Sequence, residues 1–332
     1  MNEANGLLTW VRDRLRPPAE GAGAEDEAGR RARLVAYLPI AAFLVLATIA
    51  AVTSDAFLTE SNLGNLLRQI VTNGLISLGM LVVILSGGID LSVGPTLALA
   101  GIVGAGLLNA LPWGVAVPIG VAVALVAGAV NGALVAYLRM PPFVATLATM
   151  SAFRGLVYVY SETPIVTTST SFRRFVVSSV GPVPGVALAM LACFLVVSFF
   201  LNRTTAGRNI YAIGGNAEAV RLAGIDVRAH TLLAYVISGG FSGLAGLILT
   251  SRLGIAQPSV GNGMELDAIA ACVIGGASLS GGVGTVRGTL AGVLLLGLIS
   301  NLLNLYNVQA YYQQIFKGAL IVLAVLTRRR GE

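Results

Sequence analysis

Carboxylates are rare in the apolar parts of this sequence, and three of them could do chemistry. Asp90 lies in Ser-Gly-Gly-Ile-Asp-Leu-Ser (86–92), and Glu265 and Asp267 stand at the start of a short apolar stretch. An ionised side chain at the centre of a bilayer costs about 2.5–3.5 kcal/mol, so each should lie near water or have a partner. For Asp90 or Ser92 we favour capping of the following helix over contact with a solute. Glu265 and Asp267 either cap a helix or hydrogen-bond the hydroxyl groups of a polar solute.

Side-chain amides form a second group, because Asn73, Asn131, Asn301 and Asn304 all lie within apolar stretches. Amides in membranes usually form hydrogen bonds between helices. A row of amides facing one cavity would instead suit a path for a neutral polar solute. Interhelical bonds are the expectation for all four. Our candidate pathway or helix-break residues are Asn73, Asp90, Ser92, Glu265 and Asp267.

The polar segment 202–230 separates two long apolar stretches and carries both acids and arginines. Within it, Glu218-Ala-Val-Arg221 has the composition of a helix, and Gly224 is placed to end that helix. One interpretation is a solvated loop that its arginines hold on the cytoplasmic side. The other is a short helix that binds in a groove of a separate ATPase and transmits its motion.

Several catalytic and binding chemistries are not expected from these residues. A Walker A loop needs Gly-Lys followed by Ser or Thr, and the only lysine, Lys317, lies between Phe316 and Gly318. With one histidine, and with Cys193 and Cys272 inside apolar runs, no metal site is predicted. We therefore expect neither an enzyme nor a cofactor-binding protein.

The elements that position these groups must be membrane helices. Of the 332 residues, 56% are hydrophobic and 11% are charged, whereas about a quarter are charged in soluble domains. The net charge of +6 comes without a clustered basic face, so nucleic acid is not an expected partner. The sequence predicts an all-α polytopic membrane protein of about ten transmembrane helices. The predicted spans are 34–52, 64–86, 92–110, 114–137, 142–160, 185–201, 231–251, 265–278, 287–305 and 310–327.

The arginines predict how these spans are oriented. A flexible, arginine-rich cytoplasmic tail is expected over 1–33, a transmembrane domain over 34–327 and a cytoplasmic C-terminus over 328–332. With ten spans, most arginines, including those of 202–230, fall on the side of both termini, which the positive-inside rule places in the cytoplasm.

Glycine patterns suggest close helix packing and an internal similarity. Gly128 and Gly132, Gly239 and Gly243, and the series Gly284, Gly288 and Gly292 recur every four residues, a spacing that lets helix backbones approach in lipid. The segments 87–92 and 275–280 share Gly-Gly-x-x-Leu-Ser, and each precedes a Gly/Ala-rich span. Duplicated halves are common in transporters, although a chance match in a glycine-rich chain would look the same.

Five motifs in order give this chain a resemblance to the ribose-type monosaccharide permeases of bacterial ABC importers. They are Gly-Ile-Asp-Leu-Ser-Val-Gly (88–94), Gly-Gly-Asn-x-Glu-Ala-x-Arg-Leu-x-Gly-Ile (214–225), Gln-Pro-x-x-Gly-x-Gly-x-Glu-Leu-Asp-Ala-Ile (257–269), Ile-Gly-Gly-Ala-Ser-Leu-x-Gly-Gly-x-Gly (274–284) and Tyr-Tyr-Gln-x-x-x-Lys (311–317). The resemblance runs from about residue 34 to the end and leaves out the arginine-rich tail.

This resemblance implies a type II ABC importer permease of the bacterial inner membrane. Its expected partners are a cytoplasmic ABC ATPase, a periplasmic sugar-binding protein, a second copy of itself and membrane lipid. Carried over by motif, the ATPase-coupling helix comprises Glu218, Ala219, Arg221 and Gly224. The alternative function is a gradient-driven secondary transporter of a small polar solute, in which Asp90, Glu265 or Asp267 would carry protons or ions.

Overall fold

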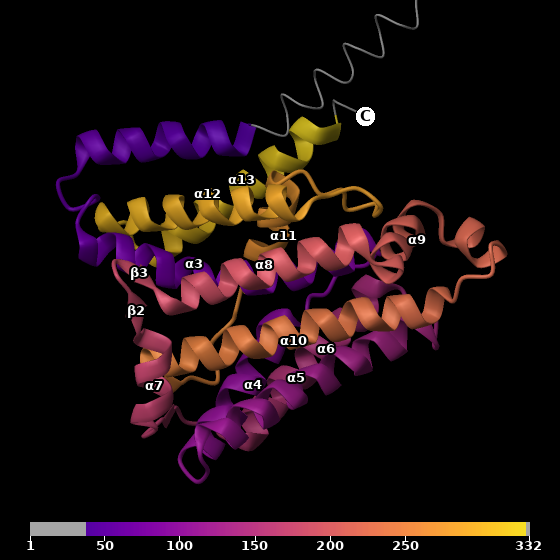
Figure 1. Ribbon diagram of the computed structural model, residues 1–332, viewed down its shortest axis with the longest axis horizontal. Helices are drawn as coiled ribbons and strands as arrows, with labels where there is room; N and C mark the ends of the chain where they lie inside the picture. The colour runs from indigo at the N-terminus through magenta and orange to yellow at the C-terminus, as the bar shows by residue number, and fades with distance from the viewer. Residues whose placement is uncertain (1–37, 330–332) are drawn as a thin grey trace, which may run out of the picture. The chain divides into compact units, whose positions relative to one another are not determined.

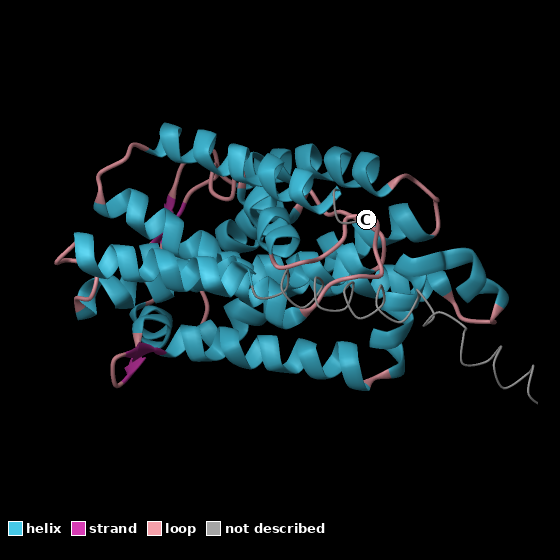
Figure 2. Ribbon diagram, turned by 90° about the horizontal axis from the view of Figure 1, so that it is seen from above, coloured by secondary structure: helices cyan, strands magenta, loops and turns pink. Residues whose placement is uncertain are grey.

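The computed structural model describes residues 38–329 (Figures 1 and 2). The predicted tail 1–33 and residues 330–332 of the predicted C-terminus lie outside the described residues. The described elements are a first helix Leu38–Thr53, α3 (Glu60–Leu85), α4 (Val93–Leu108), α5 (Trp113–Ala136), α6 (Pro142–Tyr160), α7 (Thr170–Val177), α8 (Gly185–Arg203), α9 (Thr205–Leu222), α10 (Val227–Leu253), α11 (Met264–Ile274), α12 (Val286–Leu305) and α13 (Ala310–Arg329). Two short antiparallel pairs join β1 (Ile165–Val166) to β4 (Ile255–Ala256) and β2 (Ser179–Val180) to β3 (Val183–Pro184).

Several helices begin at a residue whose side chain satisfies a backbone N–H group at the helix start. The oxygens of Thr59, Thr204, Asp226 and Thr285 each accept from the N–H group three residues later, at 3.0–3.3 Å. These caps fix the first turns of α3, α9, α10 and α12. The short loops before these helices are therefore well-defined turns in an otherwise apolar chain.

Six of the described helices are long and apolar enough to cross a membrane, by length and composition alone: α3, α5, α6, α8, α10 and α12. The helices Leu38–Thr53 and Val93–Leu108 are apolar but shorter. Each of the ten predicted spans overlaps a helix, yet the structure does not confirm ten crossings. The helix in 265–278 has only 11 residues, about 16 Å, which is half of a hydrocarbon core.

Helix α3 is the most enclosed of the long helices. In the most apolar 18-residue stretch of each helix, 78% of the residues are buried in α3, 28% in α6 and 33% in α8. Helix α10 packs against α3, α4 and α5, and α11 and α12 pack against α3 from another direction (Figure 1). An enclosed α3 can present polar side chains to a space inside the protein, whereas α6 and α8 expose apolar side chains suited to lipid.

Glycines bring α5 and α10 into close contact, as their spacing predicted. A Cβ on Gly128 would overlap the Tyr235 carbonyl oxygen, and a Cβ on Gly239 would overlap that of Ala124. Gly292 of α12 approaches the Ala271 carbonyl in the same way. The predicted series that starts at Gly284 is only partly helical, because α12 begins at Val286 and Gly284 lies in the preceding loop.

The break after α3 is a Schellman motif. Gly87 has φ +82°, and its N–H group donates to the Ile84 carbonyl at 2.9 Å, while Gly88 donates to Val83 at 3.0 Å. These two bonds satisfy carbonyls that the end of a helix would otherwise leave unpaired. A residue without a Cβ is favoured at position 87 because its φ is positive.

Helix α11 ends in the same motif, which gives the internal similarity a structural form. Gly276 has φ +91° and donates to the Val273 carbonyl at 3.0 Å, and Ala277 donates to Cys272 at 2.8 Å. Gly87, the left-handed glycine after α3, therefore corresponds in structure to Gly276. The sequence similarity aligned Gly87 with Gly275, so that alignment was wrong by one residue.

Candidate functional site

Asp90 is the buried centre of the break between α3 and α4, where it is only 1% exposed. Its Oδ1 accepts from the backbone N–H group of Ser92 at 3.0 Å and from the Ser92 hydroxyl at 2.7 Å. Its Oδ2 accepts from the Ser238 hydroxyl of α10 at 2.9 Å. The bond from Asp90 to the N–H group two residues on is an Asx-turn. The cap predicted at Asp90 or Ser92 takes this form, since the Ser92 side chain itself makes no capping bond.

Helices α5 and α6 complete the Asp90 network. The Asn131 amide of α5 donates to the Ser92 hydroxyl at 2.6 Å, and the Thr149 hydroxyl of α6 donates to the Asn131 carbonyl oxygen. The Thr146 hydroxyl donates to the Ile89 carbonyl at 3.1 Å. One carboxylate therefore ties the start of α4 to α5, α6 and α10. Neither Asp90 nor Ser92 lines the two cavities described next.

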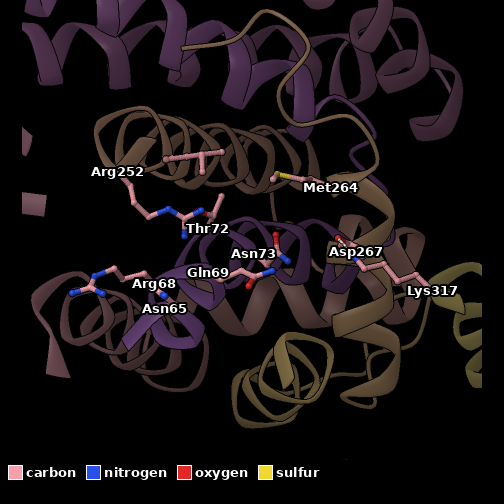
Figure 3. Close-up of a pocket in the computed structure, with 10 residues that line it drawn as sticks. Asn65, Arg68, Gln69, Thr72, Asn73, Arg252, Met264, Asp267 and Lys317 are labelled. Carbon is pink, nitrogen blue, oxygen red and sulfur yellow. Dashed lines mark hydrogen bonds and ion pairs between the residues drawn. The ribbon is translucent and has the colours of Figure 1, made fainter. Parts of the chain in front are cut away.

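A polar cavity of about 460 Å³ lies against α3 (Figure 3). We call it the α3 cavity. Its lining residues come from α3, α10, α11 and α13: Asn65, Arg68, Gln69, Thr72, Asn73, Leu249, Arg252, Met264, Asp267 and Lys317. Half of this lining belongs to α3, the most enclosed helix.

Three amides of α3 face this cavity at a spacing of four residues: Asn65, Gln69 and Asn73. Residues four apart lie on one side of a helix. Within residues 38–329 the side chains of these three form no hydrogen bond to protein. Thr72 also lines the cavity, and its buried hydroxyl has no partner among the described residues. Helix α3 thus offers the cavity a row of unpaired hydrogen-bonding groups.

The other predicted amides form interhelical bonds. Asn301 and Asn62 exchange two amide hydrogen bonds, at 2.9 and 3.2 Å, between α12 and α3. Asn304 accepts from Gln313 at 2.9 Å, and Asn131 belongs to the Asp90 network. The interhelical expectation is confirmed for these asparagines and was wrong for Asn73.

Two charged groups at one end of the α3 cavity neutralise each other. The Lys317 ammonium of α13 lies 2.7 Å from Asp267 Oδ2 of α11, and the two side chains are 26% and 17% exposed. At the other end in Figure 3 lie Arg68 and Arg252. Asp267 is thus a cavity residue already paired with a cation, and the sequence did not suggest that pairing.

Glu265 faces a different space, although it is only two residues from Asp267. It lines a cavity of about 260 Å³ together with Arg154, whose guanidinium donates to the carbonyls of Pro258 and Val260. Glu265 Oε1 accepts from the Gly263 N–H group at 3.1 Å, at the start of α11. Of the two roles predicted for Glu265, the structure shows the capping contact.

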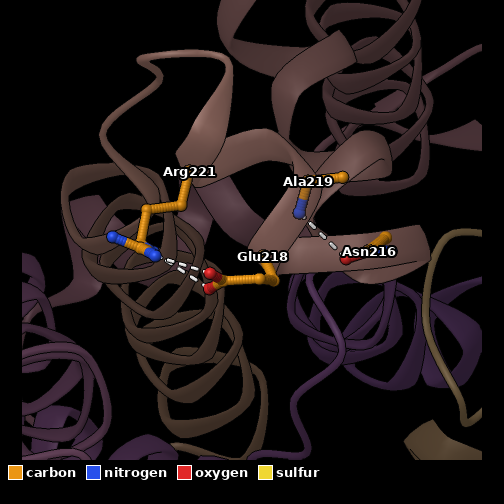
Figure 4. A network of polar contacts seen from close by, with 4 residues as sticks. All are labelled: Asn216, Glu218, Ala219 and Arg221. Atoms are coloured by element: carbon orange, nitrogen blue, oxygen red, sulfur yellow. Dashed lines mark hydrogen bonds and ion pairs between the residues drawn. The ribbon is translucent and has the colours of Figure 1, made fainter.

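The segment 202–230 is helical rather than a loop, and it contains a break. Within α9, Asn216 has φ −159° and ψ 94°, so the helix stops and restarts there. The Asn216 side chain accepts from the Ala219 N–H group at 3.0 Å, a capping bond for the restarted helix (Figure 4). We call residues 217–222 the short helix.

The short helix carries charges that suit its ends. Glu218 lies in its first turn and Arg221 in its last, and their side chains form an ion pair through two hydrogen bonds (Figure 4). The hydrogen bond from Arg221 lowers the pKa of the Glu218 carboxyl. Both side chains are about 65% exposed, so the pair adds little stability, but it holds a fixed pattern of charge toward solvent.

Gly224 ends the short helix, as predicted. It has φ +82° and donates to the Arg221 carbonyl at 3.0 Å, while Ile225 donates to Val220 at 3.3 Å, completing a Schellman motif. Val220 is buried and anchors the helix, whereas Leu222 is 74% exposed. The result is a capped helix with an exposed apolar side chain beside its charged pair.

Glycines connect α9 to the end of α3 and to the loop between α11 and α12. Gly214 lies against the Leu85 carbonyl, to which the Gly282 N–H group donates at 3.1 Å. Gly281 lies against both Gly87 and Gly214. We call Gly87, Gly214, Gly281 and Gly282 the glycine junction. A movement of α9 at this point would directly displace the end of α3 and the loop before α12.

Sequence reasoning missed the junction and most of the α3 cavity. The signal for the cavity was the spacing Asn65, Gln69, Asn73 at the start of an apolar span, of which only Asn73 was singled out. The signal for the junction was glycine pairs after two apolar helices and in the polar segment between them. Neither pattern says by itself which segments meet in space.

Comparison with known proteins identifies relatives across most of the chain. Residues 62–325 match the family described as branched-chain amino acid transport system / permease component. The ribose import permease protein RbsC of Bacillus subtilis is 44% identical over 296 residues, which cover 88% of this chain and 92% of that protein. RbsC of Escherichia coli K12 is 44% identical, covering 91% and 96%. The D-allose transport system permease protein AlsC of Escherichia coli K12 is 41% identical, covering 86% and 90%. No solved structure matches.

The Asp90 network predicts a large loss of stability for Asp90→Ala. This change leaves the two Ser92 donors and the Ser238 hydroxyl without their acceptor, and an unsatisfied buried group costs about 1–3 kcal/mol. Asp226→Ala is the matched control, because it removes a single exposed capping bond worth about 1 kcal/mol. Thermal unfolding of the purified chain in detergent should give a lower apparent Tm for Asp90→Ala. Equal Tm values for the two variants would contradict the structural role.

The glycine junction predicts opposite outcomes at two adjacent positions. A Cβ at Gly214 would overlap the Leu85 carbonyl, whereas nothing lies within 4 Å of a Cβ at Gly215. Gly214→Ala should therefore lose about 1–3 kcal/mol through overpacking, and Gly215→Ala should be neutral or more stable. The apparent Tm and the amount of chain in membranes measure both. Equal behaviour of the two variants would refute close packing at Gly214.

Proposed function

The chain belongs to this family of ABC importer permeases, and on that premise we propose that it forms the membrane pathway of a bacterial monosaccharide importer. The observation that carries the proposal is 44% identity to ribose import permeases over most of both chains. The hexose permease AlsC is nearly as similar, so the sugar class extends from pentoses to hexoses and related polyols. In this family the permease is a separate component, and ATP hydrolysis belongs to another subunit.

The proposed assembly has four kinds of partner. Two copies of this chain would sit in the inner membrane, bind a cytoplasmic ABC ATPase and receive sugar from a periplasmic binding protein. We keep the ten-span topology with both termini in the cytoplasm as part of this proposal. It places the short helix on the same side as most of the arginines, in agreement with the positive-inside rule.

The short helix is the proposed contact with the ATPase, through Glu218, Ala219, Arg221 and Gly224. Its support is the geometry of an exposed helix that is capped at both ends and anchored by one buried side chain. A rigid element with a fixed charge pair and an exposed Leu222 fits a groove in a partner better than a mobile loop would. Movement of this helix would reach α3 through the glycine junction.

The gradient-driven alternative is disfavoured by the surroundings of Asp90. Both of its oxygens accept hydrogen bonds, and it lines neither described cavity. A proton carrier needs access to water on each side of the membrane in turn. Asp267, the other candidate, is already paired with Lys317.

Reconstitution tests the proposed function directly. The wild-type chain in liposomes with its ATPase and binding protein should take up D-ribose or D-allose only when ATP is present, and a proton uncoupler should have no effect. Liposomes that contain the chain alone should show no uptake under a proton gradient. Gradient-driven uptake by the chain alone, abolished by Asp90→Asn, would establish the secondary transporter instead.

The coupling role predicts that Glu218→Lys weakens ATPase binding. The change breaks the ion pair and places two cations together on the short helix, which should reduce affinity by about tenfold or more. Glu162→Lys is the matched control, because Glu162 is also exposed and adjoins β1, at the far end of α10, a helix about 40 Å long. Co-purification with the ATPase measures both variants. Normal co-purification and uptake with Glu218→Lys would exclude this helix as the contact.

A further inference from the structure

The α3 cavity has the size of a small-molecule site. Its volume of about 460 Å³ lies within the range of about 300–1,000 Å³ that is usual for such sites. Leu249 and Met264 supply apolar surface, and the amides and Thr72 supply polar groups. Sites for sugars need both kinds of surface, because a sugar ring presents C–H groups on its faces and hydroxyls at its edge.

The unpaired groups of α3 match the chemistry of hydroxyls. An amide offers a carbonyl acceptor and two N–H donors, and a hydroxyl both donates and accepts. Asn65, Gln69 and Asn73 form no side-chain bond to protein within the described residues, in contrast to the paired Asn301. Unpaired polar groups inside a membrane protein cost free energy unless water or a solute bonds to them. Gln69 and Asn73 are half-buried, whereas Asn65 is exposed, so the two inner amides mark a place where a solute's hydroxyls can replace water.

Thr72 gives independent support. Its side chain is 3% exposed, and its hydroxyl has no partner although it lines the cavity. A buried threonine hydroxyl in a helix commonly bonds to the carbonyl four residues earlier, as Thr146 does with Pro142. The Thr72 hydroxyl makes no such bond and stays without a partner among the described residues, buried in the wall of the cavity.

The charged side chains of the cavity gather at its two ends. Asp267 is neutralised by Lys317 at 2.7 Å, so no free carboxylate faces the cavity among its lining residues. Arg68 and Arg252 lie at the opposite end from that pair (Figure 3). Gln69, Thr72 and Asn73 lie between the two ends, and Asn65 lies beside Arg68 (Figure 3).

We propose that Asn65, Gln69, Thr72 and Asn73 form a hydrogen-bonding site for a neutral monosaccharide in the permease pathway. This proposal rests on the proposed function. It assigns the sugar pathway to the side of α3 that lines the α3 cavity. The same helix ends at the glycine junction, so the site and the short helix would be linked through α3. Binding here would be weak and transient, since the site must release the sugar onward.

Uptake by the reconstituted importer tests the site with matched variants of α3. Thr72→Val and Ser77→Ala each remove a buried hydroxyl that has no partner, but only Thr72 lines the cavity. For the sugar that the wild type imports, tested first with D-ribose and D-allose, Thr72→Val should lower uptake by about three- to tenfold, the worth of one hydrogen bond. The double variant Gln69→Leu with Asn73→Leu should lose more, and Ser77→Ala should keep wild-type uptake.

Rates are compared per amount of chain in the liposome membrane. Wild-type rates for Thr72→Val and for the double variant would overturn the site, and so would equal losses in Thr72→Val and Ser77→Ala. Absence of uptake by the wild type itself would instead count against the proposed function. Preference of the wild type for an anionic sugar such as D-gluconate would overturn the neutral class and point to Arg68 and Arg252.

Thiol labelling separates contact with the sugar from an indirect effect on folding. In a chain with both natural cysteines replaced by serine, Asn73→Cys should react with a small methanethiosulfonate reagent, and excess imported sugar should slow that reaction severalfold. Gln309→Cys, an exposed position outside the cavity, should react at a rate that the sugar leaves unchanged. Labelling of Asn73→Cys that is insensitive to sugar would contradict direct binding.

Discussion

The structure depends on how the chain breaks a helix inside an apolar environment. Where α3 ends and α4 begins, backbone groups and a carboxylate lie away from water, and each needs a partner because lipid provides none. Gly87 and Gly88 satisfy the last carbonyls of α3, and Asp90 satisfies the start of α4 while bonding to α10. Because α5 and α6 join the same network through Asn131 and Thr149, the break also fixes how four helices pack.

Polar groups in this chain fall into two kinds once their partners are known. Those of the Asp90 network and the Asn62–Asn301 pair bond to protein and hold helices together. The side chains of Asn65, Gln69, Thr72 and Asn73 along the α3 cavity have no protein partner within residues 38–329, although they belong to the most enclosed of the long helices. The contrast matters because residue type alone does not separate them. Asn73 and Asn301 look alike in sequence, and only the neighbouring helix gives one of them a partner.

Much of the local structure could be predicted from the sequence, because it depends on neighbours along the chain. The helix ranges follow from apolar runs, and the end of the short helix at Gly224 follows from a residue that tolerates positive φ. The count of ten crossings is not confirmed, since α11 is apolar but has only 11 residues. The error of one residue at Gly275 arose because two adjacent glycines are equivalent in sequence, whereas only one adopts the left-handed conformation. The α3 cavity and the Asp267–Lys317 pair join residues far apart in the chain, which no local pattern reveals.

The glycine junction is built from main-chain atoms, and this has a consequence for how the protein responds to its surroundings. Contacts such as Gly214 against Leu85, and the bond from Gly282, involve no ionisable side chain. In the proposed assembly, ionic strength would screen the exposed charges of Glu218 and Arg221 and so alter how firmly the ATPase is held. Transmission through the junction would stay the same under those conditions. The proposed assembly would therefore combine a contact surface that salt weakens with an internal linkage of main-chain atoms that salt does not affect.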